Sequence, residues 1–365
     1  MRSRVSFGMA EAVVLLTMSS MARIFLPFPR YLVELSGPAA WLSSVAGLFL
    51  ALLQVYLFYI ILKPYPGENI MDITERTLGK VAGAALNIYY GFFFITIAAG
   101  FTRIFSEALL VSALPRTPIS VVATSFMLIA VMGAYLGLET MARSTRLTYP
   151  FVLGGIVVLL FGLLPRWEIS NLFPILGSGP VNVFIKGGFN AAIVTEIFLA
   201  AVIVQSFKGQ EVFGKITSRA MLMSFGYLII LEMVFIMTIN WNSAQESTLP
   251  FYQLSRLIYF GRFFQRVESI FIIIWSFIGM IKISLTLYAS AFVLAHAFRL
   301  PDHRPLVLPL AVIIYSLSFL PPDLPSSLEL ERIIRMHGVL PSIILPVLVL
   351  VLDRFRRRGS KNEAS

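Results

Sequence analysis

Apolar residues along this 365-residue chain fall into long runs separated by short polar connections. A helix needs about 20 consecutive apolar residues to cross the hydrocarbon core of a bilayer. The runs therefore predict an all-α polytopic membrane protein with about ten spans, near residues 8–33, 39–63, 81–111, 118–138, 143–164, 181–206, 214–240, 264–298, 306–320 and 336–353. The third and eighth spans are longer than an upright crossing requires, so we expect them to tilt or to continue past the interface.

Two of the connections mix apolar and charged residues at helical spacing. These are residues 68–79 (ENIMDITERTLG) and residues 249–263 (LPFYQLSRLIYFGRF). Such a pattern favours a short amphipathic helix at the membrane surface. We expect the first to be cytoplasmic and the second external.

The distribution of Lys and Arg among the connections predicts that both termini lie in the cytoplasm. With that orientation, Lys and Arg are about twice as numerous in the cytoplasmic segments as in the external ones, as the positive-inside rule requires. The formal net charge of +10 is explained by this topology, so we expect no nucleic-acid partner. We expect one integral domain over residues 1–353 and a basic cytoplasmic tail over residues 354–365.

Composition excludes a soluble enzyme. Hydrophobic residues make up 58% of the chain and charged residues only 13%, about half of the charged share of a soluble domain. The sequence has no cysteine, no phosphate-binding glycine loop, no HExxH and no GxSxG motif. We therefore expect no catalytic residue, no metal site and no cofactor.

Two predicted spans are irregular in their middle, and they stand five spans apart. The first carries hydroxyl residues, a charge and two prolines, at Thr17, Ser19, Ser20, Arg23, Pro27 and Pro29. The sixth carries glycines and polar residues, at Gly187, Gly188, Asn190, Thr195 and Glu196. Matched irregular helices in two halves predict inverted repeats, here about 8–164 and 181–353, with a binding site at the helix breaks. The alternative is that the first span is only a proline-kinked helix.

Ionisable residues inside spans are the second indication of a site, because each is costly in lipid. Arg103 and Glu107 are four residues apart and can form a structural ion pair along one helix. Lys282 has no acid nearby on its own helix, so Glu196 is its natural partner, and Thr286 lies one turn from Lys282. One cation and one anion would suit a zwitterion, with its carboxylate toward Lys282 or helix N-termini and its amine toward carbonyls or Glu196.

These patterns define one hypothesis for a ligand site. The predicted ligand-binding residues are Thr17, Ser19, Ser20, Thr195, Glu196, Lys282 and Thr286.

Three stretches give the chain a family resemblance. They are KPYPGENI (63–70), GLETMAR (137–143) and the segment 249–275, with Pro250, Tyr252, Arg256, Gly261, Arg266, Glu268 and Trp275. In these stretches and in its span layout the chain resembles the GerAB-type endospore germination permeases, the B subunits of bacterial spore germinant receptors. Family members often carry Gly where this chain has Thr195, and that difference bears on the shape of the site.

The resemblance implies properties that the residues alone do not. That family is similar to the amino acid–polyamine–organocation superfamily, which implies a five-plus-five inverted-repeat fold. It also implies assembly with A-type and C-type receptor subunits in the spore inner membrane, where the B subunit senses a nutrient, often an amino acid. The alternatives are a true amino-acid permease coupled to protons or cations through Lys282 or Glu196, and a scaffold subunit without a ligand site.

Overall fold

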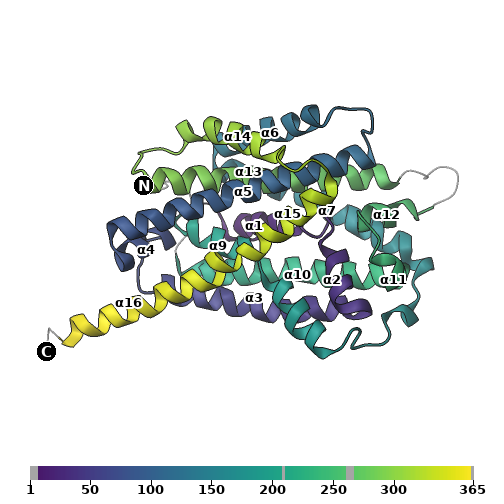
Figure 1. Cartoon of the computed structure of the whole chain (residues 1–365), viewed down its shortest axis with the longest axis horizontal. Coiled ribbons are helices and arrows are strands. Elements are labelled where there is room, and N and C mark those ends of the chain that lie inside the picture. Colours follow the sequence, from purple (N-terminus) through teal and green to yellow (C-terminus); the bar gives the residue numbers. More distant parts are fainter. Residues whose placement is uncertain (1–6, 208–209, 260–266, 363–365) are drawn as a thin grey trace.

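The computed structural model describes residues 7–207, 210–259 and 267–362, and within these ranges the chain is helical with no strand (Figure 1). The helices of the main bundle are α1 (Met9–Met21), α2 (Phe28–Ser36), α3 (Ala40–Leu62), α5 (Lys80–Ser112), α6 (Ile119–Leu136), α7 (Leu138–Leu163), α8 (Gly188–Ala192), α9 (Thr195–Val202), α10 (Phe213–Thr238), α13 (Val267–Ala297), α14 (Arg304–Ser318) and α16 (Leu345–Asn362). The remaining α-helices are α4 (Ile70–Leu78), α11 (Trp241–Ala244), α12 (Pro250–Arg256) and α15 (Leu324–His337). Two π-helices, η4 (Val181–Gly187) and η8 (Leu340–Ile344), lead into α8 and α16.

The all-α membrane layout is confirmed, with eight of the ten expected spans at full crossing length. Eight helical segments of the described residues are long and apolar enough to cross a membrane. Two shorter apolar helices, α1 and α14, stand at the first and ninth predicted positions. The chain is therefore a multi-pass membrane protein.

The two longest helices, α5 and α13, pack against each other. Their 33 and 31 residues correspond to about 50 Å and 46 Å of helix, more than the hydrocarbon core needs. Glycines allow the close approach: a Cβ atom on Gly91 would lie 2.5 Å from the Leu294 side chain, and one on Gly279 would lie 2.6 Å from the ring of Phe105. Small residues at such contacts are typical of helix packing in membranes.

The short helices α4 and α12 lie at opposite ends of the bundle (Figure 1). Both fall inside the connections that the sequence predicted to be amphipathic helices. The start of α4 is fixed by a capping box, in which the Asn69 side chain accepts from the backbone N–H of Asp72 and the Asp72 side chain accepts from the N–H of Asn69.

The segment after residue 320 differs from the prediction. Only one span was expected after residue 320, near 336–353, but the described chain forms an additional helix, α15, before η8 and α16. The sequence of α15 is too polar to look like a span, since LELERIIR carries charges on almost every turn. The segment 354–362, predicted as a basic tail, continues α16 as helix.

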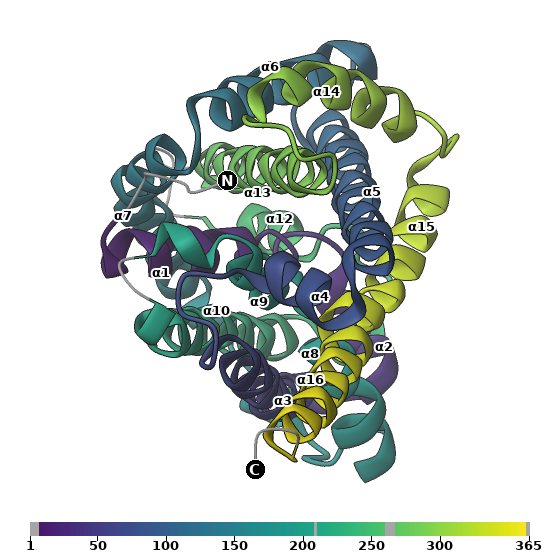
Figure 2. The same cartoon turned by 90° about the vertical axis from the view of Figure 1, so that its left-hand side faces the viewer.

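The centre of the molecule is occupied by the short helices. Viewed along the bundle, α1 and α9 lie between α5 and α13 on one side and α3 and α10 on the other (Figure 2). The inner ends of these short helices, where the two spans are broken, are buried inside the bundle. Non-helical backbone at membrane depth is tolerated only in such a position.

Candidate functional site

The first predicted span is broken in the middle. Helix α1 ends at Met21, residues 22–27 form turns, and α2 begins at Phe28. Pro27 occupies the N-cap position of α2, and Pro29 lies at its first turn, where a missing backbone N–H costs nothing. The prolines thus begin the second half-helix, and the break itself holds Arg23. A simple proline kink does not describe this span.

The sixth predicted span is broken as well, but not at its glycines. Ile193 and Val194 adopt extended backbone angles between α8 and α9. Gly187 and Gly188 instead allow α3 to approach: a Cβ on Gly187 would lie 2.3 Å from the Ser43 hydroxyl, and a Cβ on Gly188 would lie 2.9 Å from Ala46. The glycines mark a packing contact, and the β-branched pair after Ala192 marks the break.

A buried ion pair joins the two breaks to α13. The Lys282 ammonium donates to the Glu196 carboxylate, and the two side chains are 3% and 4% exposed. Ser19, near the end of α1, donates to the same carboxylate at 2.9 Å. Thr195 donates to its other oxygen at 3.3 Å, and the ammonium also lies 4.8 Å from the centre of the Phe101 ring. Glu196 is in the first turn of α9, where the helix dipole favours a negative charge.

A small cavity of about 50 Å³ lies beside this ion pair, and we call it the narrow cavity. Its lining residues are Ser19, Ser20, Arg23, Ile97, Gly100, Phe101, Ile193, Thr195, Glu196, Lys282, Glu331, Ile334 and Arg335. The Ser20 hydroxyl is buried there and has no hydrogen-bond partner among the described residues. A buried hydroxyl without a partner is costly, which makes it a polar contact available to a ligand.

Five of the seven predicted ligand-binding residues line the narrow cavity, and two do not. Thr17 donates its hydroxyl to the Val13 carbonyl at 2.7 Å, and Thr286 donates to the Lys282 carbonyl at 2.8 Å. Neither side chain is among the lining residues. Both hydroxyls are satisfied by their own helix, an arrangement that spacing along the sequence does not reveal.

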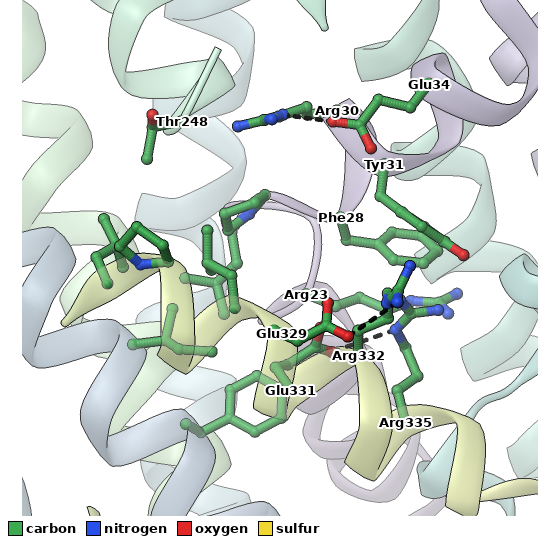
Figure 3. Close-up of a pocket in the computed structure, with 17 residues that line it drawn as sticks. Arg23, Phe28, Arg30, Tyr31, Glu34, Thr248, Glu329, Glu331, Arg332 and Arg335 are labelled. Carbon is green, nitrogen blue, oxygen red and sulfur yellow. Dashed lines mark hydrogen bonds and ion pairs between the residues drawn. The ribbon is translucent and has the colours of Figure 1, made fainter. Parts of the chain in front are cut away.

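A second cavity of about 460 Å³, which we call the wide cavity, shares part of its lining with the narrow one. Figure 3 shows the residues that line the wide cavity. It is lined by Arg23, Leu26, Pro27, Phe28, Arg30, Tyr31, Glu34, Phe101, Ile104, Thr248, Leu324, Pro325, Leu328, Glu329, Glu331, Arg332 and Arg335. Four of these residues also line the narrow cavity, namely Arg23, Phe101, Glu331 and Arg335. The two cavities therefore meet at a boundary made by the first break, α5 and α15.

Sequence reasoning missed the contribution of α15. Arg335 lies between the predicted spans 306–320 and 336–353, in a connection that the predicted topology places outside, yet it is 8% exposed and donates to the Asn190 side chain at 3.1 Å. Its guanidinium also lies 4.8 Å from the ring of Tyr31 and 3.3 Å from Glu331. The i,i+4 spacing of Glu331 and Arg335 is the signal that would have predicted a helix here.

Two other charged groups inside the bundle lie away from the narrow cavity. Arg103 and Glu107 form the expected ion pair at 2.7 Å, and Arg103 also donates to the Pro322 carbonyl at 3.2 Å. Glu232 on α10 is fully buried and accepts a hydrogen bond of 2.5 Å from Ser44. Within the described ranges, no three His, Asp or Glu side chains are grouped so as to hold a metal ion.

Comparison with known proteins identifies the family. Residues 7–325 match the spore permease family, described as "Spore germination protein". The chain belongs to this family. Of the signature residues in segment 249–275, Pro250, Tyr252 and Arg256 lie on α12, Glu268 and Trp275 lie on α13, and Gly261 and Arg266 fall outside the described residues.

Several relatives are spore germination proteins of Bacillus subtilis (strain 168). The chain is 25% identical to spore germination protein YndE over 96% of its own length and 97% of that protein. It is 24% identical to spore germination protein KB over 90% and 91%, and 26% identical to spore germination protein A2 over 68% and 69%.

The fold is that of the LeuT-type transporters. Mhp1, a nucleobase-cation-symport-1 family transporter solved with bromovinylhydantoin bound, superimposes with a TM-score of 0.67 over 96% of this chain and 78% of its own, at 13% identity. MhsT in complex with L-phenylalanine superimposes with a TM-score of 0.66 over 96% and 90%, at 15% identity. At these identities the likeness establishes the fold alone.

Proposed function

We propose that this chain is a nutrient-sensing subunit of a spore germinant receptor, built on an amino-acid-permease fold. The observation that carries the proposal is the narrow cavity at the two helix breaks, in a chain that belongs to the spore germination family. A substrate site at broken helices in mid-membrane is the usual arrangement for such folds. The ligand proposed is an amino acid, and the L-phenylalanine bound to MhsT supports that class for this fold.

The proposed ligand site comprises the residues around the ion pair. Ser19, Ser20, Thr195, Glu196 and Lys282 form its walls, and Thr17 and Thr286 support it from within their own helices. No enzymatic activity is proposed, since ligand binding alone is needed to bias a receptor between states.

The partners and location follow from the same proposal. We place the chain in the spore inner membrane with A-type and C-type receptor subunits, and with both termini cytoplasmic. The charge bias of its connections supports this orientation. The positions of α4 and α12 at opposite ends of the bundle fit it too (Figure 1). In this orientation the wide cavity, at the α12 end beside α2 and Thr248, is the external entrance.

A true amino-acid permease coupled to protons is the alternative. It is favoured by the Lys282–Glu196 pair, which links both broken helices to α13 and could respond to protonation. Concentrative uptake of a radiolabelled amino acid into proteoliposomes would support the permease. A sensor without transport should show no concentrative flux.

Germination of spores tests the proposal, with two serines as matched probes. Ser20 lines the cavity without a partner, whereas Ser290 is equally buried but donates to the Leu287 carbonyl at 2.8 Å. We expect Ser20→Ala to shift the nutrient concentration for half-maximal germination by at least threefold. Ser290→Ala should shift it by less than twofold.

Deleting the gene should abolish the response to at least one nutrient. Unchanged germination with every amino acid tried, in a strain that lacks other receptors of this family, would overturn the proposal. Equal responses of the Ser20→Ala and Ser290→Ala spores would instead favour a scaffold without a ligand site of its own.

A further inference from the structure

The acids that line the two cavities are all neutralised by neighbouring cations. Four carboxylates line the narrow and wide cavities, and each has a basic partner within 3.3 Å. The pairs are Arg30–Glu34 at 2.7 Å, Arg332–Glu329 at 2.9 Å, Arg335–Glu331 at 3.3 Å, and Lys282–Glu196. Among the described residues that line these cavities, one cation forms no ion pair with a carboxylate, and it is Arg23.

Arg23 is buried and only partly satisfied. Its side chain belongs to the first helix break and it is 9% exposed. One terminal nitrogen donates to the Ala191 carbonyl at 2.8 Å, and the guanidinium lies 4.8 Å and 5.0 Å from the rings of Phe28 and Phe225. Its Nε–H is buried with no hydrogen-bond partner among the described residues.

An anion next to this guanidinium would stabilise its buried charge. A buried charge without an ion-pair partner in direct contact is costly, and aromatic rings and a single carbonyl offset only part of that cost. The planar fork of arginine matches a carboxylate, which can accept two parallel hydrogen bonds. Arg23 also lines both cavities, so a ligand entering from the wide cavity meets it before reaching the narrow one.

The Lys282–Glu196 pair is less suited to holding a ligand's charges. Its carboxylate already accepts hydrogen bonds from Lys282, Ser19 and Thr195, and its ammonium faces the Phe101 ring. A zwitterion would have to separate the two charges before binding to either. A pair in this state acts as a neutral polar wall of the cavity.

We propose that Arg23 binds the carboxylate of the ligand at the boundary of the two cavities, while Lys282 and Glu196 stay paired. This inference rests on the proposed function, and it narrows the ligand to a small carboxylate, with or without an amine. The narrow cavity has room for about four water molecules at about 10–15 Å³ each, so the part of the ligand that enters it has only a few non-hydrogen atoms.

Ligand chemistry tests the inference without any substitution. The purified full-length chain in detergent micelles is titrated with glycine, L-alanine and propionate, and with their amides glycinamide, L-alaninamide and propionamide, by calorimetry. At least one carboxylate should bind, and its amide should bind at least tenfold more weakly. Failure of all three carboxylates to bind, or an amide that binds as tightly as its acid, would overturn the inference.

Two arginines provide the matched variants. Arg23→Gln should weaken carboxylate binding at least tenfold, and Arg23→Lys should weaken it less because the charge is kept without the fork. Arg30→Gln, which removes a wide-cavity arginine already paired with Glu34, should change affinity less than threefold. If Arg23→Gln does not fold, the comparison of acid and amide on the wild-type chain still decides.

The results separate this inference from the proposed function. Propionate binding that depends on Arg23 supports the anion site even when deletion of the gene leaves germination unchanged. Germination that depends on this gene but responds equally to L-alanine and L-alaninamide leaves the sensing role standing and overturns the role of Arg23.

Discussion

Two of the ion pairs inside the described part of the bundle differ in design. Arg103 and Glu107 lie one turn apart on α5, at 2.7 Å, with side chains 7% and 16% exposed. Lys282 and Glu196 come from α13 and α9, 86 residues apart in the chain, and are 3% and 4% exposed. The first pair belongs to a single continuous helix, whereas the second connects a long helix to the ends of two broken ones.

The two pairs therefore differ in what they need in order to form: Arg103–Glu107 needs only its own helix, and Lys282–Glu196 needs the packed fold. The Arg103–Glu107 pair can form as soon as α5 is helical, because residues four apart share one face. The Lys282–Glu196 pair forms only after α9 and α13 have packed, and the hydrogen bond from Ser19 to Glu196 requires that α1 has packed as well. The helix breaks and the Lys282–Glu196 pair therefore stabilise each other. Substitutions at this pair, at the local pair and at a surface pair should lower the free energy of unfolding by decreasing amounts.

The largest expected effect is at Lys282 and Glu196. Either Lys282→Met or Glu196→Gln should destabilise the protein by about 3–5 kcal/mol, because each leaves one charge buried without its partner. The double variant should recover most of that loss, as no lone charge remains. Unfolding of the purified chain in mixed micelles would measure this, and simple addition of the two losses would contradict the account.

An intermediate effect is expected at Arg103 and Glu107. Glu107→Gln should lower the free energy of unfolding by about 1–2 kcal/mol, because the burial of this pair is intermediate between that of a fully buried pair and that of a surface pair. Arg103 also keeps its hydrogen bond to the Pro322 carbonyl in this variant. The narrow cavity should keep its ligand affinity within twofold, since neither residue lines it. A loss of affinity as large as that of the cavity variants would show that the local pair also shapes the site.

The smallest effect is expected at the surface pair of Arg76 and Glu68, with Arg76 54% exposed. Glu68→Gln should lower the free energy of unfolding by about 0–1 kcal/mol, and this loss should be smaller at high salt. The Glu68 carboxylate raises the pKa of Arg76 above its usual value, so Arg76 stays charged, and its contribution to stability stays present, throughout the neutral pH range. Stability differences between this variant and the wild type should therefore be constant from pH 6 to 9.

The two irregular spans show which parts of a helix break can be predicted from the sequence. Hydroxyls, Arg23 and two prolines predicted a break in the first span, and the break lies beside them at residues 22–27. In the sixth span the break was expected but its cause was misassigned. Gly187 and Gly188 serve the contact with α3, and the extended residues are Ile193 and Val194.

Helix α15 was not predicted, for a related reason. Its charged sequence could not be recognised as part of the membrane domain, because only packing over the wide cavity buries Arg335. The same packing makes Glu331 and Arg335 lining residues of both cavities. Local patterns carry no information about which distant surface a polar helix will cover.

The sequence by itself determined the membrane environment, the number and order of spans, the two irregular helices and the need of Lys282 for a distant partner. These follow from local hydrophobicity and from the cost of charge in lipid, which act residue by residue. Only the tertiary structure decided that Lys282 and its predicted partner Glu196 are in direct contact, and that the hydroxyls of Thr17 and Thr286 bond to their own helices and do not line the narrow cavity. It also decided that Arg23, alone among the described cavity-lining cations, forms no ion pair with a carboxylate. Those facts depend on the packing of segments that are far apart in the chain, because pairing of buried charges is a property of the assembled fold.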